Sequence, residues 1–226
     1  MTRLRAWWRR LFALDTHAVS LERWQQAQEY EESYWLRIAR EGYFHIPKPL
    51  FETWHPLVQA WKVWALGHTY DDLQDKILLE VGCGPLGVAA ASPVPRTIGL
   101  DPLAKQYAKV YPLHKHPCQY LGAAGEAIPL ADCSVDLAVC INALDHMQNP
   151  LQTLKEIHRV LKPKGRLLLE LHLHGETDAG HPTQFELSEV KELLARAGYR
   201  ILHGTVWGDM MAPERLSLVS LVAERP

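Results

Sequence analysis

The chain has 226 residues, of which 47% are hydrophobic and 22% are charged, as expected of a globular protein that buries a core. Its 24 Lys and Arg against 26 Asp and Glu give a net charge of -2, and so weak a field argues against nucleic acid as a partner. The 14 Gly and 15 Pro are close to average use, which excludes the collagen-like and disordered classes.

The first 14 residues combine four arginines with tryptophan, leucine and phenylalanine. Arg9 and Arg10 interrupt the apolar run that a signal peptide needs, and no stretch reaches the roughly 20 apolar residues of a membrane span. Such a segment either touches an anionic membrane surface peripherally or forms a helix that frays or contacts a second copy. Four cysteines without a CxxC pair predict no disulfide framework and a reduced, cytoplasmic setting.

Two amphipathic helices are predicted in residues 1–75, a region that holds seven of the eight tryptophans. Apolar residues recur at three- and four-residue steps from Trp24 to Ile38, and glycine and proline end this first helix. The second helix, over 51–68, carries Trp54, Leu57, Val58, Trp61 and Ala65 on one face. Aromatic stripes at helical spacing are mostly core packing, so we expect this face to be buried, with ligand contact as the alternative.

From residue 76 onward, short apolar runs alternate with helical patterns. The alternation predicts a mainly parallel α/β sheet with helices on both faces and an antiparallel pair of strands at its C-terminal edge. The last predicted helix has Ser188 as its N-cap and Gly198 just past its end. The predicted strands are 77–81, 97–100, 118–121, 135–140, 166–171, 200–207 and 216–223, and the predicted helices are 87–91, 103–110, 150–161 and 188–198.

The first of these strands leads directly into Gly82, Gly84 and Gly87. Glycine allows the backbone to turn sharply and to approach a ligand closely. Asp101 ends the second strand about twenty residues later, where a carboxylate can accept both hydroxyls of a ribose. The pattern predicts a nucleoside-containing cofactor. An ordinary tight turn with an incidental acid is the alternative, and the same glycine spacing also fits nicotinamide cofactors.

Motifs further along the chain indicate which of these cofactors is bound. In their order and spacing, residues 76 to about 200 resemble class I S-adenosylmethionine-dependent methyltransferases. The resemblance implies a Rossmann-like fold, S-adenosylmethionine as cofactor, and methyl transfer to a small-molecule acceptor. The motifs are LEVGCGP at 79–85, GLDP at 99–102, GEAIPL at 125–130, SVDLAV at 134–139, ALDH at 143–146 and EIHRVLKPKG at 156–165.

The resemblance also implies which residues bind the cofactor. The glycine loop and its acid hold the methionine end, Asp101 binds the ribose, a segment after the third strand lies along the adenine, and the end of the fourth strand passes near the sulfonium. Ala124 stands where the family often has an Asp, so the adenine contact is expected from backbone or from Glu126. The implied residues are Glu80, Gly82, Cys83, Gly84, Gly87, Asp101, Pro102, Ala124, Gly125, Glu126, Ile141 and Asn142.

Histidines cluster after the fourth and fifth predicted strands, at the edge of a parallel sheet where ligands bind. Methylation of an oxygen needs a proton acceptor, and histidine suits this at neutral pH. We predict His146 and His181 as catalytic residues, with His172 and His174 as further candidates; packing and loop ordering are the alternatives. The cluster has the ligand types for a metal but no HExxH or CxxC spacing, so no metal is predicted.

Together these patterns predict an enzyme with a helical cap over 1–75 and a cofactor-binding domain over 76–226. It methylates a small polar acceptor, at oxygen by preference, although the sequence leaves nitrogen and carbon open. The leading segment 21–35 is similar to that of some bacterial methyltransferases of sugar and surface-polysaccharide pathways, which points to a sugar or a lipid-linked sugar. A nicotinamide-dependent oxidoreductase and a non-catalytic S-adenosylmethionine-binding protein are the alternatives, and the oligomeric state is open.

Overall fold

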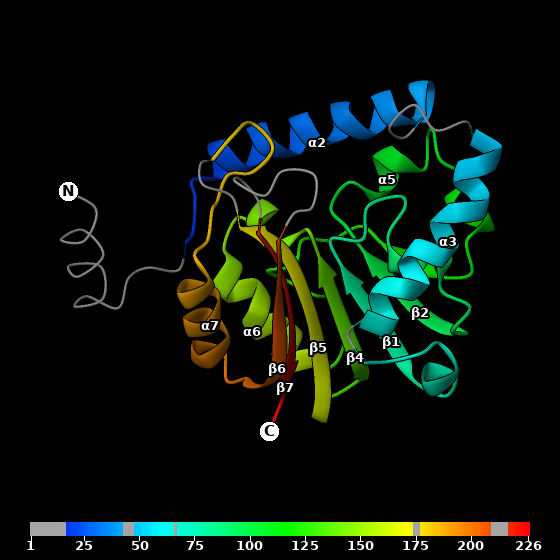
Figure 1. Cartoon of the computed structure of the whole chain (residues 1–226). Coiled ribbons are helices and arrows are strands. Elements are labelled where there is room, and N and C mark those ends of the chain that lie inside the picture. The colour runs from blue at the N-terminus through cyan, green and yellow to red at the C-terminus, as the bar shows by residue number, and fades with distance from the viewer. Residues whose placement is uncertain (1–16, 43–47, 66, 174–176, 209–216) are drawn as a thin grey trace.

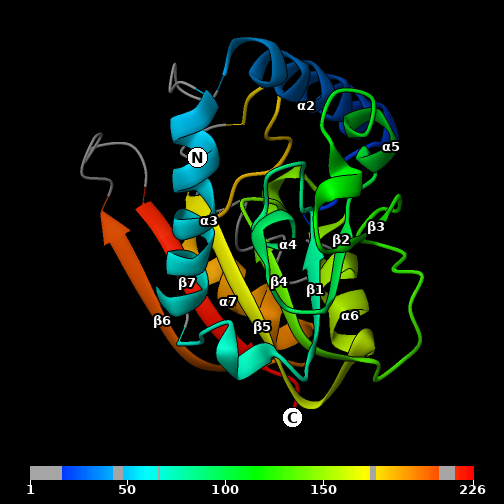
Figure 2. The same cartoon turned by 90° about the vertical axis from the view of Figure 1, so that its right-hand side faces the viewer.

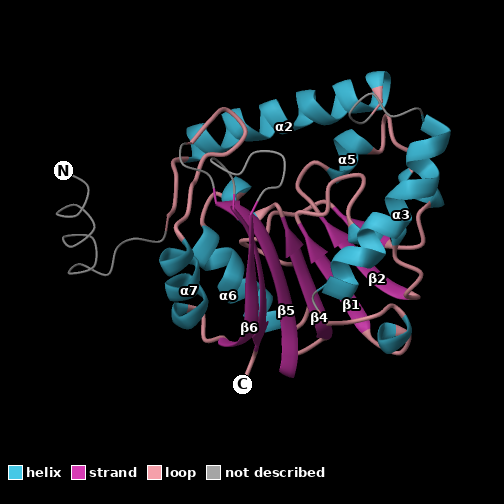
Figure 3. Cartoon of the chain, in the orientation of Figure 1, coloured by secondary structure: helices cyan, strands magenta, loops and turns pink. Residues whose placement is uncertain are grey.

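The structure, a computed structural model, describes residues 17–42, 48–65, 67–173, 177–208 and 217–226. Its centre is a seven-stranded sheet in the order β3-β2-β1-β4-β5-β7-β6 (Figure 3). The strands from β1 to β5 pair in parallel, whereas β7 runs antiparallel to both β5 and β6. The strands are β1 (Ile77–Val81), β2 (Arg96–Leu100), β3 (Gln119–Leu121), β4 (Val135–Ile141), β5 (Leu161–Leu173), β6 (Arg200–Gly208) and β7 (Ser217–Glu224).

Helices cover both faces of the sheet. Helices α3 and α4 lie on one face and α6 and α7 lie on the other (Figure 2), while α2 crosses above the carboxyl ends of the parallel strands (Figure 1). The helices are α2 (Leu21–Glu41), α3 (Lys48–Ala65), α4 (Val88–Ala91), α5 (Ala104–Tyr107), α6 (Pro150–Val160) and α7 (Leu187–Arg196), with short 3₁₀ turns η1 (Asp71–Leu73), η2 (Leu113–Lys115) and η3 (Leu144–His146). The predicted fold class is therefore confirmed.

The core follows from the two-residue period of the strands, because successive side chains point to opposite faces of the sheet. In β1, Leu78 packs in a cluster with Val63 of α3 and Val88 of α4. Its neighbour Leu79 belongs to the larger cluster that contains Leu154 of α6. Strand β1 is thus buried on both sides, which explains why it reads as a mostly apolar run rather than as an alternating one.

Most predicted elements are found within a few residues of their expected ends, but the start of α7 differs. Glu186, not Ser188, occupies the N-cap position. Its backbone N–H donates to Glu189 Oε2 at 2.8 Å, which is one half of a capping box. The Ser188 prediction is wrong because the carboxylate of Glu189 reaches back to an earlier residue. Gly198 does follow the helix, with a φ of 95°.

Helix α2 forms as expected, whereas α3 presents the opposite face from the one predicted. The Ser20 hydroxyl accepts the Arg23 N–H at the start of α2, and Gly42 at a φ of 85° ends it. On α3, Trp54, Leu57 and Trp61 are 50%, 64% and 51% exposed. The prediction that this aromatic stripe is buried is wrong. Helical spacing shows that residues share a face, but the neighbouring elements determine which face is covered.

Two sequence-based predictions concern residues outside the described ranges. The basic aromatic segment at 1–14 is one of them, and His174 is the other. Among the residues that the structure describes, no helix has both the length and the apolar content needed to cross a bilayer.

Candidate active site

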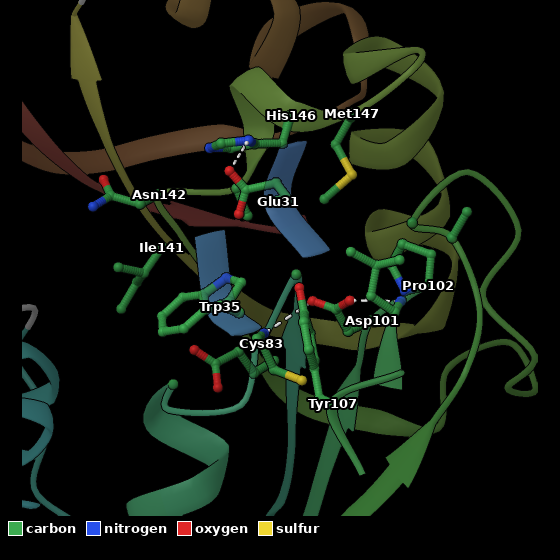
Figure 4. A pocket seen from close by; sticks show the side chains of 18 of the residues that line it. Glu31, Trp35, Cys83, Asp101, Pro102, Tyr107, Ile141, Asn142, His146 and Met147 are labelled. Carbon is green, nitrogen blue, oxygen red and sulfur yellow. Dashed lines mark hydrogen bonds and ion pairs between the residues drawn. The ribbon is translucent and has the colours of Figure 1, made fainter. Parts of the chain in front are cut away.

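One cavity opens at the carboxyl ends of the parallel strands, under α2 (Figure 4). The residues that line it include every cofactor-binding residue implied by the sequence, as well as His146. The fold therefore brings together loops that are separated by up to about sixty residues of chain. These residues are Glu80, Gly82, Cys83, Gly84, Gly87, Asp101, Pro102, Ala124, Gly125, Glu126, Ile141 and Asn142.

The glycine loop after β1 has a backbone that other residues adopt with difficulty. Gly82 has a φ of 70°, and a Cβ there would lie 2.4 Å from the Cβ of Ala143. Gly84 has a φ of 52°, and its Cβ would lie 3.5 Å from the indole of Trp35. Glycine is needed at Gly82 for packing and at both positions for conformation. The loop thereby leaves a narrow space between its backbone and the Trp35 ring.

Asp101 lies at the end of β2 with its carboxylate buried beside the loop. Its Oδ2 accepts the Gly84 N–H at 2.9 Å, and its Oδ1 accepts the Leu103 N–H at 2.8 Å. Burial raises the pKa of this carboxyl to about 6, against the lowering effect of those two hydrogen bonds. Each carboxylate oxygen has a further lone pair, so Asp101 keeps the capacity to accept two ribose hydroxyls.

Glu80 lines the cavity and also binds the backbone that follows the glycine loop. Its two carboxylate oxygens accept the N–H groups of Val88 and Ala89, at 3.0 and 2.6 Å. Burial raises the pKa of this carboxyl to about 7. Because its oxygens bind the backbone of α4, Glu80 holds the shape of the glycine loop.

The segment after β3 lines the cavity with little side-chain bulk. A Cβ on Gly125 would lie 2.8 Å from Thr153 Cγ2 of α6, so only glycine fits there. The carboxylate of Glu126 accepts the Asn149 N–H at 2.8 Å. If Glu126 contacts the adenine, its carboxylate has to do so while it accepts this hydrogen bond from the start of α6.

His146 and His181 are 35 positions apart in sequence and adjacent in space, since their ring centroids lie 4.6 Å apart. His146 Nδ1 lies 3.5 Å from Glu31 Oε1 of α2, as Figure 4 shows. His181 Nδ1 lies 2.8 Å from Asp178 Oδ1. The residues that line the cavity include His146 but not His181. His172, at the end of β5, is half-buried and is not among the residues that line this cavity.

The sequence-based prediction missed the contribution of the two N-terminal helices. One stripe of α2 faces the cavity at 4-3-4 spacing, and α3 adds an amide and a cation. Polar side chains inside an otherwise aromatic stripe were the signal that could have identified this face, because a face that only packs against the core is apolar. The missed residues are Trp24, Gln28, Glu31 and Trp35 on α2, and Gln59 and Lys62 on α3.

Helix α2 is tied to the loop that carries His181. The Arg23 guanidinium donates to the carbonyl oxygen of Ala179 at 3.1 Å and to that of Asp178. A Cβ on Gly180 would lie 2.8 Å from Tyr30 Cδ1, so the helix packs directly on this glycine. The position of Glu31 is thereby linked to that of His181.

Comparison with known proteins agrees with this architecture. Residues 79–169 match the family model of a methyltransferase domain. An uncharacterized methyltransferase of Mycobacterium ulcerans is 33% identical over 102 residues, which cover 44% of this chain and 40% of that protein. A relative from Mycobacterium leprae is 32% identical over 109 residues, covering 47% and 40%. The matched region thus spans about 40% of the length of these relatives.

Solved structures with the same fold have low sequence identity. An S-adenosylmethionine-dependent methyltransferase of Mesorhizobium loti superposes with a TM-score of 0.56 at 16% identity, covering 66% of this chain and 91% of that one. The [4+2]-cyclase SpnF superposes equally well, with a TM-score of 0.56 at 19% identity, covering 70% and 79%. The fold alone therefore does not specify a reaction. Residues 79–169 match a methyltransferase domain in sequence, and the glycine loop and Asp101 line one cavity, as binding of S-adenosylmethionine by such a domain requires.

Proposed function

We propose that this protein transfers a methyl group from S-adenosylmethionine to a hydroxyl of a small polar acceptor, with His146 as the proton acceptor. The observation that supports this most directly is the position of His146. It lines the same cavity as the glycine loop and Asp101, and Glu31 lies beside its ring. A cofactor site and a group able to take a proton therefore share one space.

The residues around the cavity fit the chemical parts of the cofactor. Asp101 can accept ribose hydroxyls, and the Trp35 ring and the Gly84 backbone both line the cavity beside it. Lys62 brings a positive charge to the cavity wall, complementary to a carboxylate. When bound, S-adenosylmethionine supplies an electrophilic methyl group on a positively charged sulfur.

The carboxylate of Glu31 orients the His146 ring. At 3.5 Å from Nδ1, it favours the tautomer that carries its proton on Nδ1, so that Nε2, which lies 3.9 Å from Asp145 Oδ1, can accept a proton. The proton of the acceptor hydroxyl then goes to Nε2 as its oxygen forms the new bond to carbon, and the electron pair of the broken carbon–sulfur bond stays on sulfur. His181, held by Asp178, fixes the His146 ring from the other side.

The lining of the cavity favours a sugar-like acceptor. Trp24, Trp35 and Tyr107 supply flat apolar surfaces, and Gln28 and Gln59 supply amides. Sugars present both apolar faces and hydroxyl groups, so this mixture suits them. We accordingly propose a sugar or a lipid-linked sugar as the acceptor, and the cytoplasm as the compartment of the reaction. Residues 1–75 would form a cap over the cofactor-binding domain, residues 76–226. The four cysteines are unpaired in the structure, which is consistent with a reducing compartment.

The test uses the purified full chain with S-adenosylmethionine and a panel of sugars, phenols and amines, and it measures release of S-adenosylhomocysteine. We expect turnover on a hydroxyl-bearing acceptor. His146→Gln should lower turnover about 100-fold or more, because general bases contribute at least this much, and should change the affinity for S-adenosylhomocysteine by less than about threefold. His203→Gln, at an exposed position on β6, is the matched control. Binding of NAD without binding of S-adenosylhomocysteine would refute the proposal.

A further inference from the structure

Two imidazoles face one buried carboxylate at the edge of the cavity. His146 Nε2 lies 3.9 Å from Asp145 Oδ1, and His181 Nε2 lies 3.9 Å from Asp145 Oδ2. Asp145 itself is only 2% exposed. One ligand atom from each of the three residues lies within 4.8 Å of the other two. Two histidine nitrogens and a carboxylate oxygen therefore converge on a single small volume.

The other nitrogen of each ring also faces a carboxylate. His146 Nδ1 lies 3.5 Å from Glu31 Oε1, and His181 Nδ1 lies 2.8 Å from Asp178 Oδ1. A carboxylate beside Nδ1 holds the proton there and keeps the Nε2 lone pair available. Histidines that bind metals usually have this arrangement, in which an outer carboxylate fixes the tautomer and the ring orientation. Asp178 makes this hydrogen bond to His181, and Glu31 lies near enough to His146 Nδ1 to do so after a small shift. Both Nε2 atoms face Asp145.

From this geometry we propose that Asp145, His146 and His181 bind one divalent transition-metal ion, of the type of Zn²⁺. Metal–ligand bonds of about 2.0 to 2.2 Å place neighbouring ligand atoms about 3.0 to 3.5 Å apart. The two imidazole–carboxylate pairs at 3.9 Å use different oxygens of Asp145, and one ligand atom from each residue lies within 4.8 Å of the others, so the ligand atoms have to close by roughly 0.5 to 1.5 Å to reach that range. Two imidazoles and one carboxylate leave coordination positions open, as catalytic sites require.

Three separate parts of the chain build this site, and each is held in place. Asp145 and His146 lie on η3, between β4 and α6. Helix α2 supplies Glu31, and its Arg23 donates to backbone oxygens of the loop that carries Asp178 and His181. The carboxylates of Glu31, Asp145 and Asp178 add negative charge, which favours a cation. Preorganisation of this kind lowers the cost of ion binding, because ligands already lie close to their final positions.

The role of the ion rests on the proposed function, but its binding does not. Of the three ligands, His146 lines the cavity and Asp145 and His181 do not, so an ion could meet an acceptor only at the His146 edge of the cavity. A coordinated hydroxyl loses its proton more readily than a free one. In the metal-loaded protein, Nε2 of His146 would bind the ion, and the proton of the coordinated hydroxyl would pass to solvent water instead of to His146.

The test titrates Co²⁺ and Zn²⁺ into the untagged full chain after chelator treatment, following the visible absorption of Co²⁺ and its displacement by Zn²⁺. We expect about one equivalent to bind. His181→Gln and Asp145→Asn should each weaken binding at least tenfold, and Asp178→Asn about tenfold, the usual effect of losing an outer carboxylate. His203→Gln should leave binding unchanged. Measurement of S-adenosylhomocysteine affinity in each variant establishes that the fold is intact.

Two results would overturn the metal site. One is binding of less than half an equivalent of either ion, and another is unchanged binding in His181→Gln while the cofactor site is intact. Full methyl transfer in the presence of chelator, by protein that holds no metal, would overturn the role of the ion in the reaction but not its binding. In contrast, stoichiometric binding without methyl transfer to any acceptor would leave the metal site standing and count against the proposed function.

Discussion

The Oδ2 atom of Asp101 accepts a hydrogen bond from the backbone N–H of Gly84 at 2.9 Å. This bond ties the end of β2 to the glycine loop that follows β1. A single buried carboxylate thus supports the loop and remains available to a ligand in the cavity. Its removal should affect both the shape of the loop and the binding of the cofactor.

Asp101→Ala should weaken the binding of S-adenosylhomocysteine at least tenfold. The ribose loses its acceptor and Gly84 loses its partner, and hydrogen bonds to charged groups contribute about 1.5 to 3 kcal/mol each. Isothermal titration calorimetry measures the effect. Asp75→Ala is the matched control, because the Asp75 side chain is 78% exposed. Equal affinities of the two variants would show that Asp101 does not contact the cofactor.

Cofactor affinity should depend on pH in the acidic range. Burial raises the pKa of Asp101 to about 6 and that of Glu80 to about 7. The ionised carboxylate of Asp101 is the form that accepts ribose hydroxyls, so affinity for S-adenosylhomocysteine should fall as the pH drops below about 6. Titrations between pH 5 and pH 8 measure this. Asp101→Asn should have a flatter profile, and an unchanged profile in that variant would assign the dependence to another group, Glu80 first.

Gly180→Ala tests the packing of α2 on the histidine loop. The new Cβ would lie 2.8 Å from Tyr30 Cδ1, so the helix or the loop has to shift. We expect a loss of about 1 to 3 kcal/mol in the free energy of unfolding, as for other overpacked sites. Gly122→Ala is the control, since its Cβ would meet only Lys105, at 3.9 Å. Urea denaturation compares the two, and equal stabilities would contradict this packing.

Neighbouring residues of α3 test which of its faces is buried. Val63 is 1% exposed and Trp64 is 64% exposed. Val63→Ala should lower the free energy of unfolding by about 2 kcal/mol, from lost burial and the cavity that remains. Trp64→Ser should change it by less than about 1 kcal/mol. Urea denaturation measures both variants. A larger loss of stability in Trp64→Ser than in Val63→Ala would contradict the burial of Val63 and the exposure of Trp64.

Much of the sheet could be predicted because its signals are local. Strands buried on both faces require continuous apolar runs, and β1 and β4 appear in the sequence as such runs. Gly82 is needed for a positive φ and for close contact with Ala143, so the turn after β1 is also visible in the sequence. The bounds of β5 and the cap of α7 were predicted less well. Strand β5 begins five residues before the predicted start and ends two residues after the predicted end, and a carboxylate that reaches back moves the cap of α7 to Glu186.

The sequence by itself determined which segments form strands, the glycine loop and the place of Asp101 at the end of a strand, since each depends on residues close together in the chain. Only the tertiary structure decided that His146 and His181 meet over Asp145, that Glu31 joins them, and which face of α3 is covered. Helical or strand spacing shows which side chains share a face. It carries no information about the partner of that face, because contacts between distant segments depend on how the whole chain packs.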